Sequence, residues 1–153
     1  MDPSDAATKL LDTQDHMTVA TADAAGRPWV SPVFFVRDPN YGLYWVSSKT
    51  AVHSANIRAR PEVCIVVFVT GPAKAIYVEA QARELQDEGE ILEAIPLLAA
   101  KPQPTKFTVT GLGDVTGDNA WRIYKARPKA AWTRADADEG EQAVTIREPV
   151  SLP

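Results

Sequence analysis

The sequence has little cysteine, little histidine and no excess of positive charge. Cys64 is the only cysteine in 153 residues, which excludes an internal disulfide and a cysteine-rich zinc site. The net charge is -4 at pH 7, whereas a protein that binds duplex nucleic acid needs a basic face to displace counterions. We therefore exclude general nucleic-acid binding. His16 has no second histidine or carboxylate at metal-ligand spacing, so no metal site is predicted.

Long hydrophobic runs are also missing. The start of the chain, Met1 to Thr13, is polar and acidic, and the apolar run from Val63 to Val69 has only the length of a strand. We expect a cytoplasmic protein without a membrane partner. At 45% hydrophobic residues, 153 residues can bury a substantial core, which predicts one domain spanning residues 1–153.

Hydrophobic patterning indicates a mainly β protein. Turn signals such as Asp23 to Gly26 and Asp38 to Gly42 separate short stretches that are rich in β-branched and aromatic residues. Helices are predicted over Ser4 to Leu11, from Thr50 or Ala51 to Pro61, and over Glu88 to Ala100. Strands are predicted at Met17 to Thr21, Trp29 to Val36, Leu43 to Val46, Glu62 to Val69 and Ala75 to Leu85, with less decisive candidates at Trp121 to Ala126, Lys129 to Arg134 and Ala143 to Ile146. About six strands with flanking helices predict a small antiparallel β-barrel.

One polar turn stands out as a candidate anion site. Ser47, Ser48 and Lys49 end a strand where a helix is about to begin, and the first amides of a helix lack intrahelical partners. Thr50 is a plausible helix cap, and His53, one turn into the helix, can add a donor from the same end. The alternative is that the turn is an ordinary solvated one, with His53 on the surface.

The strand Val63 to Val69 is apolar on both faces. One face would fill the core, and a partner subunit is the simplest cover for the other, which predicts a homodimer. Cys64, inside this run, is expected to be an inert core residue.

Three stretches together resemble a known family. The succession VATADAAGRPWVSPVFFV, LYWVSSKTAVHSANIRARPEVCIVVFV and AIYVEAQAREL resembles the pyridoxamine 5'-phosphate oxidase-like, FMN-binding split-barrel superfamily. The resemblance implies a six-stranded antiparallel split barrel with Greek-key connections. It also implies a homodimer that holds FMN, or a deazaflavin coenzyme, in clefts at the subunit interface. The implied cofactor-binding residues are Ser31, Pro32, Val33 and Phe34, along the isoalloxazine edge through backbone groups, and Ser47, Ser48, Lys49 and His53, facing the phosphate.

The sequence also departs from that family. The oxidase has an arginine three residues after the hairpin proline, where this chain has Ser31 after Pro28, and its later basic pair is matched only by Val52 and His53. The resemblance therefore implies a flavin- or deazaflavin-dependent oxidoreductase acting on a small-molecule substrate other than pyridoxamine phosphate. We nominate no catalytic side chain, because the cofactor would carry the chemistry. The alternative is a non-catalytic protein that binds a flavin, haem or similar anionic ligand in the same cleft, with His53 as an axial ligand only if its ring points into that cleft.

Overall fold

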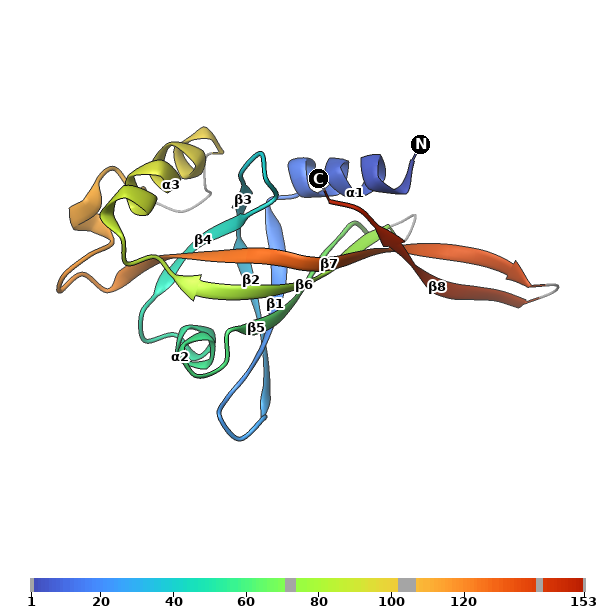
Figure 1. Cartoon of the computed structure of the whole chain (residues 1–153), viewed down its shortest axis with the longest axis horizontal. Coiled ribbons are helices and arrows are strands. Elements are labelled where there is room, and N and C mark those ends of the chain that lie inside the picture. Colours follow the sequence, from blue (N-terminus) through green and yellow to red (C-terminus); the bar gives the residue numbers. More distant parts are fainter. Residues whose placement is uncertain (1, 71–73, 102–106, 140–141, 153) are drawn as a thin grey trace.

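A computed structural model describes residues 2–70, 74–101, 107–139 and 142–152 (Figure 1). The helices are α1 (Pro3–Thr13), α2 (Val52–Ala59) and α3 (Glu88–Ala100), with a 3-10 turn η1 (Leu112–Asp114). The strands are β1 (His16–Ala22), β2 (Pro28–Phe34), β3 (Val36–Arg37), β4 (Leu43–Ser48), β5 (Glu62–Phe68), β6 (Ala75–Glu84), β7 (Trp121–Glu139) and β8 (Gln142–Val150).

The strands form one antiparallel sheet in the order β2-β1-β5-β6-β7-β4-β3, with β8 paired to β7. The sheet curls into a half-barrel flanked by helices, which confirms the predicted mainly β split barrel. The described residues contain eight strands rather than six. β7 is a single strand where two were predicted, and Figure 1 shows it extending with β8 beyond the barrel as a ribbon.

Alternation along the strands creates the core. In β1, Met17, Val19 and Thr21 are buried, while the residues between them are partly exposed. Trp45 of β4 and Tyr124 of β7 are fully buried and stack with ring centroids 5.5 Å apart inside the barrel. The barrel is therefore filled by side chains near its centre.

Two helices cover different parts of the sheet. α3 matches its predicted bounds, is capped by the Asp87 carboxylate, and packs Ile91 and Leu98 into a second hydrophobic cluster with Tyr44 and Ile123. α2 crosses the other end of the barrel (Figure 1). None of the helices among the described residues is long and apolar enough to span a membrane.

The cap predicted for α2 is wrong. Ala51 occupies the N-cap position and offers no side-chain hydrogen bond. The Thr50 hydroxyl lies 2.9 Å from the Ser48 hydroxyl instead, because the chain forms a tight turn at Ser48 in which the Thr50 amide donates to Ser48 Oγ.

One face of β5 lies in the core and the other does not. Val63, Ile65 and Val67 are buried, as predicted, but Phe68 is 52% exposed and Cys64 is also exposed. The prediction that Cys64 is a core residue is therefore wrong for the single chain. The apolar run is two-sided in sequence, yet one chain covers only one of its faces.

Candidate functional site

Buried polar side chains gather under α2. Ile57 is the buried apolar residue of this short helix, so the face of α2 that carries Ile57 lies against the barrel. His53 lies four residues earlier and therefore on the same face, so it is carried inward and is only 8% exposed. The buried polar residues of this region are Thr21, Ser31, Ser47, His53, Ser54 and Asn56.

The centre of the site is a hydrogen-bonded row of three side chains, which we call the Ser–His–Ser cluster (Ser31, His53, Ser47). His53 Nδ1 lies 3.0 Å from Ser31 Oγ, and His53 Nε2 lies 2.8 Å from Ser47 Oγ. The three residues come from β2, α2 and β4, so the fold brings together positions 31, 47 and 53. Burial lowers the pKa of His53, which keeps the imidazole neutral at pH 7.

The other buried polar groups hold α2 in place. Asn56 Nδ2 donates to Thr21 Oγ1 on β1 at 3.0 Å, and the Ser54 hydroxyl donates to the Ser48 carbonyl at 2.8 Å. These two bonds fix the helix against β1 and the end of β4. Sequence reasoning did not identify Asn56 or Ser54, although Asn56 lies three residues from His53 and Ser54 three residues from Ile57, and this spacing was the available signal.

Trp29 forms the exposed border of the cluster. Its indole Nε1–H donates to Ser31 Oγ at 3.1 Å, while its side chain is 48% exposed. Val30 and Pro32, its neighbours on β2, are exposed as well. β2 is the edge strand of the sheet, so backbone groups on its outer side have no strand partner in the described part of the chain. The predicted residues Ser31, Pro32, Val33 and Phe34 all lie on this edge strand.

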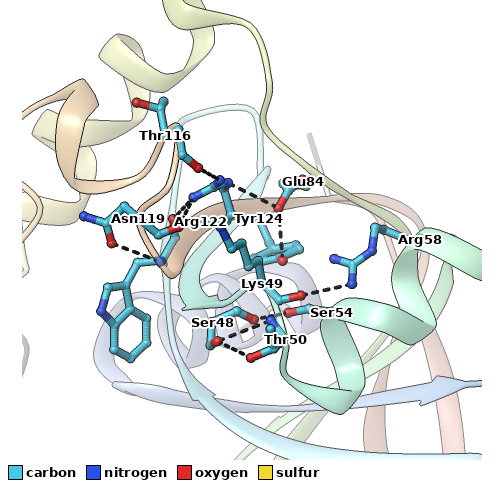
Figure 2. A network of polar contacts seen from close by, with 12 residues as sticks. Ser48, Lys49, Thr50, Ser54, Arg58, Glu84, Thr116, Asn119, Arg122 and Tyr124 are labelled. Atoms are coloured by element: carbon cyan, nitrogen blue, oxygen red, sulfur yellow. Dashed lines mark hydrogen bonds and ion pairs between the residues drawn. The ribbon is translucent and has the colours of Figure 1, made fainter.

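Ser48 and Lys49, in contrast, are not brought to the cluster. Successive residues of a strand point to opposite faces, so Ser48 lies on the other side of β4 from Ser47. Figure 2 shows Ser48 bonded to Thr50, and Lys49 Nζ donates to the carbonyl of Asp118 at 3.5 Å. The predicted phosphate-facing set therefore divides into Ser47 and His53 in the cluster and Ser48 and Lys49 in the neighbouring loop.

A second polar network braces that loop (Figure 2). Arg122 donates to the carbonyls of Gly117 and Asn119 at 2.6 and 2.7 Å, and its Nε lies 3.7 Å from Glu84. The Tyr124 hydroxyl also donates to Glu84, at 3.4 Å. Arg122 thus connects β6 and β7 to the loop that contacts Lys49.

The hydrogen-bonding groups of the cluster fit a phosphate monoester, but the charge of the cluster does not match that of a phosphate. Serine hydroxyls can donate to phosphate oxygens, and those of Ser31 and Ser47 are held together by His53. No lysine or arginine belongs to the cluster in the described part of the chain, and Lys49, two residues after Ser47, is the cation nearest along the sequence. Arg58 donates to the Lys49 carbonyl at 3.0 Å.

Comparisons with known proteins agree with this fold. The family model described as pyridoxamine 5'-phosphate oxidase matches residues 3–112, well over half of the chain. No curated protein matches the sequence significantly.

Three solved structures are similar at low identity. A protein of unknown function from Agrobacterium tumefaciens, Atu2129, is 16% identical with a TM-score of 0.69; the match covers 85% of this chain but only 55% of that protein. An FAD-binding protein from Mesorhizobium loti is 21% identical with a TM-score of 0.65, covering 81% of this chain and 88% of that one. HutZ, the haem storage protein from Vibrio cholerae, is 19% identical with a TM-score of 0.63, covering 80% and 87%. At these identities the similarity shows a shared fold.

Proposed function

The chain belongs to the pyridoxamine 5'-phosphate oxidase family, and from this premise we propose that it is a flavin-dependent oxidoreductase that binds FMN. The observation that carries the proposal is the convergence of Ser31, Ser47 and His53 beside an exposed tryptophan. When bound, the flavin would supply the hydride chemistry, and the protein would supply hydrogen bonds, orientation and exclusion of water.

The two parts of the cofactor would meet different parts of the site. Ser31 and Ser47 would donate to the phosphate, with Lys49 adding positive charge from the adjacent loop. The free edge of β2 from Ser31 to Phe34 would offer backbone groups to the polar rim of the flavin ring, and Trp29 would give the ring an apolar neighbour. A deazaflavin coenzyme would use the same positions. The FAD-binding protein of the same fold supports a flavin-type ligand.

We propose a small-molecule substrate other than pyridoxamine phosphate. Pyridoxamine phosphate would bring a second phosphate to the site, and the Ser–His–Ser cluster contains no permanent cation to neutralise that phosphate. Ser31 offers only a hydroxyl, and His53 is neutral at pH 7 because burial lowers its pKa. An uncharged or weakly charged substrate suits this site better.

The second part of the proposal is a homodimer that uses the outer face of β2, β1 and β5. Val30 is 58% and Phe68 is 52% exposed on this face, and Cys64 lies between them, opposite Ala20 of β1. Exposed apolar side chains on one face of a sheet are typical of a protein interface. A second copy would bury this face.

The alternative is a protein that binds its ligand without turnover. The similarity to a haem storage protein supports haem as a candidate ligand. Both ring nitrogens of His53 are already hydrogen-bonded to serines, so iron ligation by His53 would require one of these bonds to break. This arrangement favours a flavin over haem at the cluster.

Absorption spectroscopy during titration separates these functions. Purified protein is titrated with FMN, a deazaflavin and haemin in turn, and the bound flavin is then reduced anaerobically with a nicotinamide donor. FMN binding followed by reversible bleaching of its blue absorption supports the oxidoreductase. A Soret band without flavin binding would support the alternative, and a protein that binds neither flavin would refute the proposal.

A further inference from the structure

Both ring nitrogens of His53 are committed to serine hydroxyls, and this limits what those hydroxyls can do. A neutral imidazole has one N–H donor and one acceptor nitrogen. One serine therefore accepts from the ring, and the other must donate its hydroxyl hydrogen to it. Only one of the two hydroxyls, on Ser31 or on Ser47, is then free to donate to a ligand.

Protonation changes this count. An imidazolium has two N–H donors, so His53 would donate to both Ser31 and Ser47 at the existing distances of 3.0 and 2.8 Å. Both hydroxyl hydrogens would then be released to point at an anion, with a positive charge directly behind them. The protonated cluster presents two donors and one charge, which is the better arrangement for a phosphate dianion.

In the part of the chain that the structure describes, no charged group around the cluster already stabilises the imidazolium. The charged side chains on the surrounding elements are engaged elsewhere: Asp23 with Arg27 at 2.7 Å, Arg58 with the Lys49 carbonyl, Arg60 with the Ala24 carbonyl and Glu84 with Arg122. Lys49 itself contacts the Asp118 carbonyl, and Tyr124 is neutral because burial raises its pKa. Burial alone accounts for the lowered pKa of His53 in the protein without ligand.

Resting on the proposed function above, we propose that the flavin phosphate binds against Ser31 and Ser47 together with one proton, which His53 takes up from solvent. The proton adds to the acceptor nitrogen of the ring, and no other bond is formed or broken. The site thus gains its cation only when the anion is present. His53 is a specificity-determining residue in this scheme, because it favours a phosphate-bearing flavin over one without phosphate.

The proposal predicts a pH dependence of binding. An opposite charge within a few ångströms raises the pKa of a histidine, so the pKa of His53 is expected to lie higher in the complex than in the free protein. As the pH rises between these two pKa values, FMN affinity should fall by up to about tenfold per pH unit. The measurement belongs between about pH 7 and pH 8.5, where the phosphate is already a dianion.

Calorimetry in two buffers of different ionisation enthalpy counts the protons taken up with FMN. Wild type should take up close to one proton, whereas His53→Gln keeps a donor and an acceptor but should take up none and bind about tenfold to a hundredfold more weakly. Riboflavin, which lacks the phosphate, should bind wild type without proton uptake. His16→Gln, which alters the only other histidine, is the matched control and should behave as wild type.

Nuclear magnetic resonance gives a readout that does not depend on any variant's folding. With only two histidines, the imidazole signals are easily assigned, and the pKa of His53 should rise when FMN is added. FMN binding without proton uptake and without a shift of this pKa would overturn the inference while leaving the proposed function intact. Equal uptake with riboflavin would also overturn it. If no flavin binds at all, the proposed function itself fails.

Discussion

The Ser–His–Ser cluster makes a prediction about the stability of the protein without ligand. Folding holds His53 between two serines in a buried site that lowers its pKa from the ordinary value of 6.5. As pH falls through 6.5, the unfolded chain binds a proton at His53 that the folded chain does not bind. The free energy of unfolding should therefore decrease on acidification, and the loss continues until the pH reaches the folded pKa.

The variant His53→Gln isolates this effect, because glutamine does not titrate. The maximum contribution of one histidine is about 1.4 kcal/mol per pH unit. At pH 7.5 the variant should be less stable by roughly 1–2 kcal/mol, since glutamine reaches Ser31 and Ser47 less well than the imidazole. At pH 5.5 this difference should shrink or reverse, because acidification destabilises the wild type through His53 but does not destabilise the variant at this position.

Urea denaturation of both proteins at several pH values measures the difference directly. Protein concentration must be equal throughout, because any dimerisation adds to the apparent stability. Carboxylates with lowered pKa values, such as Asp23 and Glu90, titrate in both proteins and cancel in the comparison. A stability difference that stays constant from pH 7.5 to 5.5 would refute the reasoning that the pKa of His53 is lowered by folding.

Three further outcomes are expected. Lys49→Ala should weaken FMN binding by about tenfold with little change in the melting temperature of the apoprotein, because Lys49 is a partly exposed loop residue; unchanged affinity in a titration would exclude it from the phosphate site. Phe68→Glu should convert the proposed dimer to a monomer in sedimentation and speed the reaction of Cys64 with a thiol reagent; equally fast labelling in wild type would argue against the proposed interface. Asp87→Ala should cost about 1 kcal/mol in denaturation experiments by removing the cap of α3, and no loss would contradict that role.

Local patterns were sufficient for most of the fold. The period-two alternation of Ala75 to Leu85 corresponds to β6, and the apolar spacing and acidic start of Glu88 to Ala100 correspond to α3. β7 was missed as one strand because Pro128 suggests a break. In the structure, the pairing of β6 and β7 shifts register there, opposite Glu79 and Ala80, and this irregularity accommodates the proline.

The candidate site was predicted in part. Sequence reasoning grouped Ser47, Ser48, Lys49 and His53 because they are neighbours along the chain. Strand alternation separates Ser47 from Ser48, and this was available from the sequence. The contact between Ser31 and His53 was not, because it joins residues 22 positions apart through the packing of α2 on β2.

The distribution of buried polar residues argues that the region under α2 does more than support the fold. Among the described residues, every buried polar or charged side chain except Thr133 belongs to this region. Apolar residues of similar size at positions 31, 47 and 53 would fill the space without desolvating polar groups, so the cluster brings little stability that a simpler core could not provide. Polar groups retained at such a position are expected where a ligand needs them. Trp29, which donates to Ser31 of the cluster, is exposed on the edge strand β2, and this is the side from which we expect a flavin to approach.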